Sequence, residues 1–478
     1  MRERTGSGGD RRTDVAPFAR SLLVIHMSLA DAPPKSLSDP ALKAALQDLR
    51  RTDNLTNWFY LARTYLYLAA VLGGAVWFFE SREALGLHWL LNVPVALLAI
   101  VLVGAGQHQL TGLAHEGSHH ILFRGRYLND LATDLLTMFP LFSSIYHYRL
   151  QHLAHHQFVN DPDRDPDVSQ LKTSGHWLDF PVERPEAIRA LLRQLWPFRL
   201  IRFMRVRARY NATGADSNPY LFKGKKPSKG AVRVGVVYLL ALVGTLAGLF
   251  FAADEAWLLL AVPAAMWVVV SGVFLKLPND KYHQSRLHPV IHARYTSILR
   301  VGFITAVFAG LTFAQKVTGS PYVGYYALLW LVPLFTSFAF FMILRQIVQH
   351  GNGGRGWLTN TRTFLVAPAI RFAVFPMGQD YHLPHHLYAT IPHYRLRKLH
   401  DLLMTYPDYR DEAVVVEGYF RPPHTPQTRP TVIDVLGPGY AGAGKAVYID
   451  NTVMDGDTFE EQEQLRAEAE SLKANGAT

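Results

Sequence analysis

The stretch His152-Leu153-Ala154-His155-His156 decides how this chain folds. Related clusters occur upstream, at residues 115–119 (HEGSH), and downstream, at residues 382–386 (HLPHH). On a helix, residues three and four apart share one face, so each cluster points two or three imidazoles in one direction. Imidazole is a common ligand of iron, copper, zinc and nickel. Three clusters are more than one ion needs, so we expect one polyhistidine site for two metals.

Apolar runs of membrane-spanning length recur along the 478 residues. A span needs about 20 apolar residues. The candidates are residues 59–79, 88–106, 232–252 and 256–275, with a weaker pair at 298–314 and 322–344. The sequence therefore predicts an all-α integral membrane helical bundle of four to six spans, with a histidine-rich cap for two metals on the cytoplasmic side.

Charge and cysteine content narrow the classes of protein. The formal net charge is +10, and with spans present we attribute it to lipid headgroups rather than to nucleic acid. The chain has no cysteine, which excludes disulfides, thiolate metal sites, iron–sulfur ligation and a cysteine nucleophile.

The three clusters share a site only if they lie on one side of the membrane. Arginines 184–209 and lysines 223–229 assign their loop to the cytoplasm by the positive-inside rule. Residues 131–145 are apolar, but they are short and contain Pro140, so we expect a surface-lying or re-entrant helix. An even number of crossings between His156 and His350 then returns the chain to the cytoplasmic face.

We divide the chain into three regions: a polar, disordered region at 1–54, a membrane domain at 55–405 and a soluble tail at 406–478. Within the first region Met27 is a plausible second start, and residues 39–51 are expected to form an amphipathic helix on the membrane surface. An acidic helix is expected at 458–473.

The first cluster has a second interpretation. Residues 115–119 match H-E-x-x-H, in which two histidines bind zinc and Glu116 acts as the base of a protease. An intramembrane zinc protease is therefore one alternative, although it leaves the other two clusters unexplained.

The text around the clusters resembles the membrane fatty acid desaturase family over about residues 55–405. The segments are 115–130 (HEGSHHILFRGRYLND), 147–167 (HYRLQHLAHHQFVNDPDRDPD) and 381–393 (YHLPHHLYATIPH). The family carries three boxes, H-x(3–4)-H, H-x(2–3)-H-H and [HQ]-x(2–3)-H-H. The resemblance implies a non-haem centre of two iron ions. The implied ligands are His115, His119, His152, His155, His156, His382, His385 and His386, with His350 as a ninth outside the boxes.

Residues near the boxes are expected to orient the imidazoles or to contact substrate. The candidates are Gln346, His120, His147, Asp165, Asp167, Asp380 and His393, and also Asp130 and Asp163. Gln346 stands where relatives place an Asn or a water-bridging group, so the resemblance leaves its role as a ligand open.

The resemblance implies an oxidoreductase that uses O₂ to introduce a double bond into a lipid acyl chain, carried as acyl-lipid or on an acyl carrier. Electrons would come from an external ferredoxin or cytochrome b5-type protein, which arginines 184–209 suit if they do not bind lipid instead. The alternatives are a di-iron lipid or carotenoid hydroxylase or ketolase, a zinc hydrolase, and a metal-binding membrane protein without catalysis. We expect the protein in the bacterial cytoplasmic membrane; its oligomeric state stays open.

Overall fold

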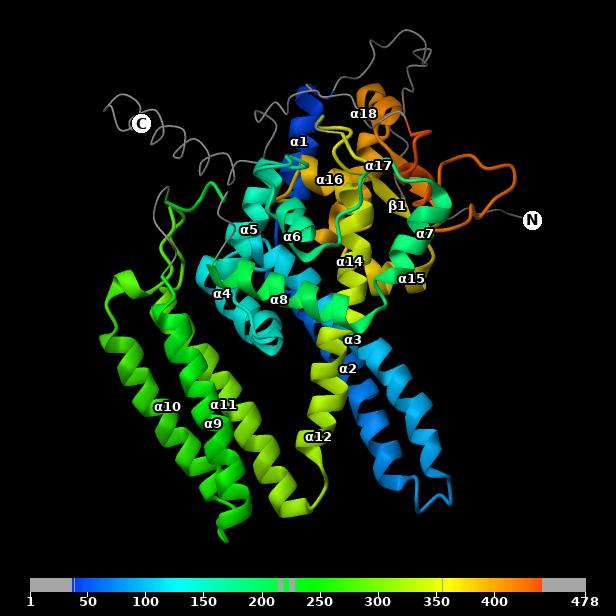
Figure 1. Cartoon of the computed structure of the whole chain (residues 1–478). Coiled ribbons are helices and arrows are strands. Elements are labelled where there is room, and N and C mark those ends of the chain that lie inside the picture. Colours follow the sequence, from blue (N-terminus) through cyan, green and yellow to red (C-terminus); the bar gives the residue numbers. More distant parts are fainter. Residues whose placement is uncertain (1–36, 38, 214–217, 223–227, 355, 441–478) are drawn as a thin grey trace, which may run out of the picture.

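The computed structural model describes residues 37, 39–213, 218–222, 228–354 and 356–440 (Figure 1). The possible start at Met27, the region before residue 37 and the acidic helix at 458–473 lie outside these residues. The described part is built from helices and one small parallel sheet, in which β1 (Thr363–Leu365) pairs with β2 (Val415–Glu417). This confirms the all-α prediction.

Six helical segments of the described chain are long and apolar enough to cross a membrane. They are α2 (Thr56–Ser81), η1–α3 (Trp89–Ser118), α9 (Gly230–Ala252), α10 (Leu258–Lys276), α11 (Ala293–Thr318) and the run α12–α14 (Tyr322–His350). The last run contains a π-helical stretch, η5 (Ala327–Leu331), and α13 (Val332–Phe335). The integral membrane bundle is thus confirmed at the upper end of the expected range.

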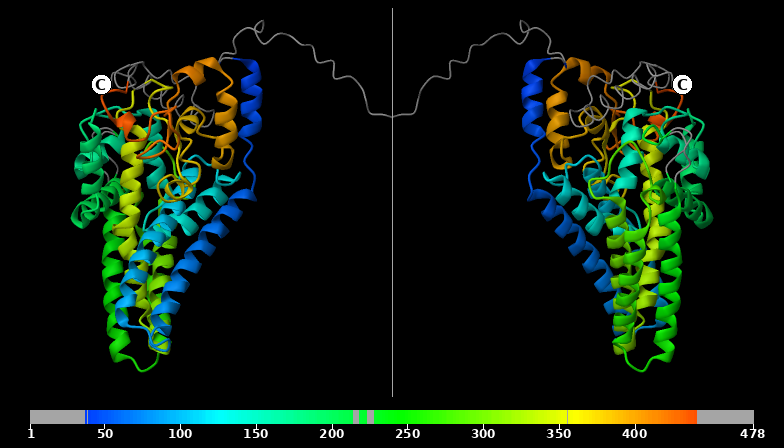
Figure 2. Two further views of the ribbon diagram at one scale, coloured as in Figure 1. Left: turned by 90° about the vertical axis from the view of Figure 1, so that its right-hand side faces the viewer. Right: turned by 90° about the vertical axis from the view of Figure 1, so that its left-hand side faces the viewer.

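The long helices and a cap of shorter elements occupy opposite ends of the molecule (Figures 1 and 2). The α2–α3 hairpin and the α9–α11 bundle extend from the cap as two separate arms (Figure 1). The cap elements are α1 (Pro40–Leu49), α4 (Arg126–Thr133), α5 (Ile145–Gln157), α6 (Pro166–Ser174), α7 (Arg184–Arg193), α8 (Pro197–Thr213), α15 (Pro368–Val374), α16 (His382–Leu387), α17 (Leu396–Leu403), α18 (Pro407–Glu412) and the C-terminal half of α14 (Ser337–His350).

Helix α3 (Asn92–Ser118) continues well past residue 106, where the sequence analysis ended the second span. Its residues from Val103 to Ser118 are all buried, including polar side chains such as Gln107 and Gln109. The helix thus extends beyond the expected end of the span, because tertiary packing keeps the polar stretch helical. A single continuous helix therefore connects the apolar end of the molecule to the cap.

The segment before α5 does not cross the bundle. It consists of α4, a π-helical stretch η2 (Asp134–Met138) and a short turn η3 (Phe139–Leu141), and the chain reverses at Phe142 in a left-handed conformation. This agrees with the expected re-entrant or surface-lying segment. Four spanning segments then separate His156 from His350, the even number that one shared site requires.

Two peripheral segments pack on the cap. Helix α1 buries Leu42 and Leu46 in a cluster with Leu399 and Leu403 of α17, at the end of the molecule away from the long helices (Figure 1). The prediction that its apolar face lies on the membrane is therefore wrong, because protein covers that face. Beyond β2, residues 432–436 enter the main apolar core beside α14.

Candidate metal centre

All nine histidines singled out as ligands lie together in the cap, and each is at most 8% exposed. They form two groups, and within each group one ring nitrogen per residue lies within 4.8 Å of all the others. The larger group contains His115, His119, His152, His156 and His385. The smaller group contains His155, His350, His382 and His386.

Four helices supply these side chains, and histidines four residues apart on one helix fall in the same group. The end of α3 contributes a pair four residues apart to the larger group only, and the last residue of α14 contributes to the smaller group only. Helices α5 and α16 contribute to both groups, since their adjacent histidines point to different sides. The rings of His156 and His386, one from each group, stack 4.3 Å apart, so the groups are neighbours.

Facing ring nitrogens show whether this donor set suits metal ions. In the larger group the Nε2 atoms of His152 and His119 lie 2.8 Å apart, and those of His156 and His385 lie 3.0 Å apart. In the smaller group His350 Nε2 lies 2.9 Å from His382 Nε2. Both ring nitrogens of His115 lack a hydrogen-bond partner among the described residues. Buried nitrogens that converge without enough partners fit a cation in each group.

The protonation state of the imidazoles agrees with metal ligation. Burial, followed by neighbouring imidazoles, lowers the pKa of several of them far below 6.5; these are His152, His156, His382, His385 and His386. Neutral imidazole is the form that binds a metal ion. These five rings are therefore neutral nitrogen donors shielded from water.

Asp165 orients one ring of the smaller group. Its carboxylate oxygens lie 2.9 and 3.0 Å from His155 Nδ1, while His155 Nε2 faces His350. Burial alone would lower the pKa of His155, but the carboxylates of Asp165 and Asp167 outweigh it and raise that pKa to about 9. Asp165 is fully buried and also accepts hydrogen bonds from the backbone amides of Asn160 and of Asp167 at the start of α6. This carboxylate–imidazole pair fixes the ring and directs Nε2 inward.

Glu116 has a similar place beside the larger group. One carboxylate oxygen lies 3.5 Å from His115 Nδ1, and the other accepts a hydrogen bond of 2.8 Å from the backbone amide of His393. The side chain therefore ties α3 to the segment after α16. The sequence analysis considered Glu116 only as the base of a protease. Its position next to His115 was the one feature of the sequence that indicated a positioning role.

The remaining candidates lie outside both groups. His120 Nδ1 lies 3.5 Å from Asp130, and His393 Nε2 contacts the Asn57 side chain at 3.0 Å. His147 shares a hydrogen bond with Ser144 and packs against His283, away from the ligand cluster. Asp380 pairs with Arg371 at 2.7 Å rather than with a histidine.

Asp163, Asp167 and Gln346 make fewer contacts. The backbone amides of Asp163 and Asp167 donate to Asp161 and Asp165, whereas no hydrogen bond to the Asp167 carboxylate is found in the described chain. The side-chain oxygen of Gln346 is buried and has no hydrogen-bond partner there either.

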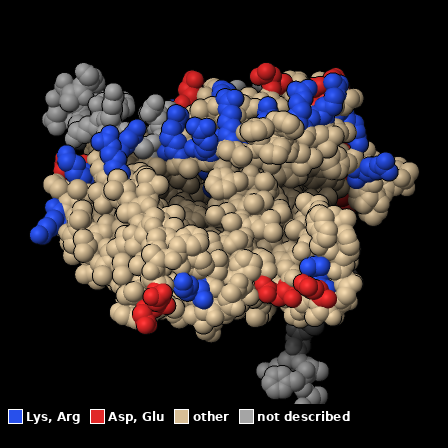
Figure 3. Space-filling model, turned by 60° about the horizontal axis from the view of Figure 1, so that its bottom comes forward, with Lys and Arg blue, Asp and Glu red and all other residues tan. Residues whose placement is uncertain are grey.

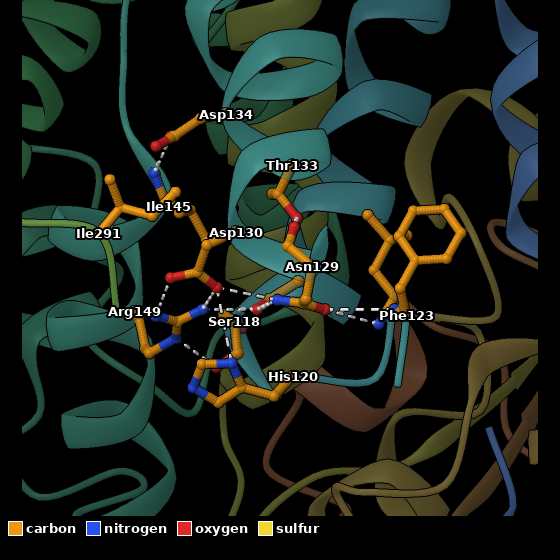
Figure 4. A network of polar contacts seen from close by, with 12 residues as sticks. Ser118, His120, Phe123, Asn129, Asp130, Thr133, Asp134, Ile145, Arg149 and Ile291 are labelled. Atoms are coloured by element: carbon orange, nitrogen blue, oxygen red, sulfur yellow. Dashed lines mark hydrogen bonds and ion pairs between the residues drawn. The ribbon is translucent and has the colours of Figure 1, made fainter. Parts of the chain in front are cut away.

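Arg149 was missed by the sequence analysis, although it lies inside the second box segment. Its guanidinium donates to both carboxylate oxygens of Asp130, at 2.6 and 2.9 Å, and to the carbonyls of Gly117 and Ser118 (Figure 4). These carbonyls belong to the last turn of α3, where a helix leaves acceptors unpaired. Asn129 adds a further bond to Gly117. The network locks α3, α4 and α5 together where two boxes meet.

Comparisons with known proteins identify the family to which the chain is similar. The family model described as "Fatty acid desaturase" matches residues 87–313 and 274–416. The dihydrorhizobitoxine desaturase of Bradyrhizobium elkanii is 30% identical over 135 residues, which is 28% of this chain and 35% of that protein. The Delta(5) fatty acid desaturase fat-4 of Caenorhabditis elegans is 39% identical over 72 residues, 15% of this chain and 16% of that protein. The chain thus aligns with about a third or less of the length of these relatives.

Proposed function

The chain belongs to the fatty acid desaturase family, and from this premise we propose that it inserts a double bond into a lipid acyl chain with O₂ at a histidine-held pair of iron ions. The observation that carries the proposal is the pair of adjacent, buried histidine groups. The overall change is CH₂–CH₂ + O₂ + 2e⁻ + 2H⁺ → CH=CH + 2H₂O. The acyl chain loses two electrons, and an external donor supplies the other two.

Each group would hold one ion: five imidazoles from α3, α5 and α16 for the first, and four from α5, α14 and α16 for the second. Two irons, when bound, would supply the oxidising power that an unactivated methylene requires. The chain's own residues do the rest. Neutral imidazoles leave the site more positive than carboxylates would, Asp165 fixes the ring of His155, and burial excludes water.

A zinc protease is less well supported. Its base would be Glu116, yet this carboxylate accepts a hydrogen bond from the backbone of His393 and lies on the Nδ1 side of His115. A single zinc also needs three protein ligands and an open position, whereas nine imidazoles converge here.

We propose that the cap faces the cytoplasm of a bacterial inner membrane. Lys and Arg side chains gather along the border toward the cap, and the broad face below it carries almost no charge (Figure 3). The distant turn between α9 and α10 contains Asp254 and Glu255. This asymmetry follows the positive-inside rule.

The electron donor is proposed to be a separate ferredoxin or cytochrome b5-type protein, since the chain has no cysteine for an iron–sulfur centre. The arginines suggested for its docking are largely engaged within the chain. Arg184 pairs with Asp434, Arg189 and Arg193 pair with Glu186, and Arg199 donates to the Gly175 carbonyl. These pairs stay exposed at the surface and partly neutralise the basic charge that a donor would meet.

The desaturase domain is proposed to span residues 55–405. The family match extends to residue 416, and β2 together with residues 432–436 packs on the body of the cap. The first part of the proposed soluble tail therefore supports the fold of the domain.

Lipid profiling of a host that expresses the chain tests the function. We expect acyl chains lower in mass by two hydrogens, in the wild type only and not with His155→Ala or His386→Ala. Products heavier by one oxygen would instead assign hydroxylation to the same site, and an unchanged lipid profile with hydrolysed membrane peptides would support the protease.

A further inference from the structure

Asn160 lies between two segments that hold rings of the four-histidine group. Helix α5 ends at Gln157, and Asn160 follows it in a left-handed backbone conformation with φ 60°. Asparagine adopts this conformation more readily than most residues do. The chain therefore turns sharply after α5, and both the backbone N–H and the side-chain amide of Asn160 face other parts of the cap.

The backbone of Asn160 holds the partner of His155. Its N–H donates a hydrogen bond of 2.9 Å to Asp165 Oδ2. The same carboxylate lies 2.9 and 3.0 Å from His155 Nδ1. Because Asp165 is fully buried, contacts within the protein rather than water set the direction of its carboxylate.

The side chain of Asn160 holds the partner of His350. Its Nδ2 donates to the carbonyl of Asn360 at 2.8 Å and to that of Gly354 at 2.7 Å, which uses both N–H groups of the amide. The Asn360 carbonyl also lies 3.2 Å from His350 Nδ1, and an oxygen with two lone pairs can accept both bonds. Nε2 of this ring then faces His155 Nε2 at 3.2 Å.

The bridge made by Asn160 is closely packed. A Cβ added at Gly353 would lie 2.9 Å from the Asn360 carbonyl oxygen and 3.0 Å from Asn160 Nδ2, so the loop after α14 folds directly onto the amide. The same loop returns to the end of α14, where Arg362 donates to two backbone carbonyls. Asn160 thus connects the chain after α5 with the loop that caps α14.

We propose that Asn160 is a positioning residue for the metal ion of the four-histidine group. It sets the rings of His155 and His350 through the Asp165 carboxylate on one side and the Asn360 carbonyl on the other. Groups that hold the second nitrogen of a ligand imidazole fix the orientation of the ring, and their loss weakens metal binding.

The effect of Asn160 is confined to one of the two ions. Within the described chain its hydrogen bonds lead to His155 and His350, and none of them reaches the five-histidine group. This role rests on the metal centre proposed above and goes beyond it, since it makes the two ions separable by a change at a residue that binds neither.

The test titrates the purified, metal-free full chain in detergent with ferrous iron in the absence of oxygen. The wild type should bind two irons, and His350→Ala identifies the one that belongs to the four-histidine group. Asn160→Gly keeps the left-handed backbone and the N–H to Asp165 but removes the amide. It should weaken binding of that iron roughly 10- to 100-fold and change the affinity for the other by less than about threefold.

Two further measurements sharpen the test. Asn160→Asp has the same shape as the wild-type side chain but no N–H groups, so it should weaken the same iron at least as much as Asn160→Gly does. Mössbauer spectra of the iron-loaded proteins should show one altered signal, the one that His350→Ala lacks, beside one unchanged signal. A general loss of stability would not select one of the two signals.

Asn352→Gly is the matched control. Asn352 also lies just after α14 in a left-handed conformation, with φ 56°, and its Nδ2 donates to the carbonyls of Val435 and Gly437, both at 3.0 Å. This variant therefore loses as many hydrogen bonds as Asn160→Gly, but none that leads to a ligand histidine. It should lower the melting temperature by a similar amount and bind both irons with wild-type affinity.

A wild-type protein that binds fewer than two irons would contradict the proposed metal centre itself, before any variant is compared. With two irons bound to the wild type, three results would overturn the role of Asn160: equal weakening of both irons in Asn160→Gly, the same selective loss in Asn352→Gly, or wild-type affinities in both Asn160 variants. Melting temperatures check that each variant is folded; should Asn160→Gly not fold, Asn160→Asp carries the test.

Discussion

At the scale of single residues, the two carboxylates Asp165 and Asp167 stand close in sequence but differ in what they touch. Asp165 contacts His155 Nδ1 at 2.9 Å and is fully buried, whereas the Asp167 carboxylate makes no such contact among the described residues. A carboxylate that holds a metal-binding imidazole fixes both its tautomer and its ring plane. The sequence offered both as equal candidates, because the distance to a ring is a property of the fold.

Asp165→Asn should therefore lower metal affinity and turnover by roughly 10- to 100-fold, as loss of such a partner does elsewhere. Asp167→Asn is the matched control and should change both by less than about threefold. Metal titration of the apoprotein and lipid product analysis measure the two effects. Equal losses in both variants would show that general charge near α6, rather than contact with His155, matters.

His350 is the ligand that lies outside the three boxes, and it belongs to the four-histidine group. His350→Ala should remove about one of the two metal ions and abolish turnover, because three imidazoles remain in that group. His147→Asn is the control, since His147 lies outside both groups, and it should keep the full metal content. Elemental analysis of purified variants decides; a His350→Ala protein with two ions and full activity would remove His350 from the site.

At the scale of elements, the length of the apolar runs predicts where the spans lie. It does not predict the structure of the segments that connect the spans to the histidine groups. Helix α3 stays helical beyond the predicted end of the span at residue 106. Its buried polar side chains Gln107, His108 and Gln109 donate hydrogen bonds to the backbone carbonyls of Trp330, Ala373 and Phe372 in other segments. Likewise, the spacing in α5 predicts shared faces, yet His155 joins a different group from His152. That division depends on the positions of α14 and α16 in the folded protein, which the spacing within α5 does not determine.

Helices α3 and α14 pack closely where they cross, and this contact positions the ligand histidines at their C-terminal ends. A Cβ added at Gly104 would lie 2.7 Å from the backbone nitrogen of Phe338, which cannot move aside as a side chain could. Gly104→Val should therefore destabilise the protein by about 1–3 kcal/mol, the usual range for overpacking, and lower its melting temperature. Gly244→Val on α9 is the matched control, because nothing lies within 4 Å of that position. Equal shifts in both variants would indicate a helix-propensity effect instead.

At the scale of the whole molecule, the cap and the far ends of the arms are opposite (Figure 2). The absence of native cysteine makes the topology simple to test with single introduced thiols. In oriented membrane vesicles, Lys398→Cys on α17 and Asp254→Cys at the α9–α10 turn should react with an impermeant maleimide from opposite sides. Labelling of both from the same side would refute the arrangement of spans, and with it one shared cytoplasmic site.

The central claim is that three distant segments and the end of α14 build a centre for two iron ions. Quantitative metal analysis of the purified full-length protein tests this most directly. We predict about two irons per chain, one for each histidine group. A chelator should remove these irons and abolish desaturation at the same time. A single zinc ion per chain without iron would contradict the account.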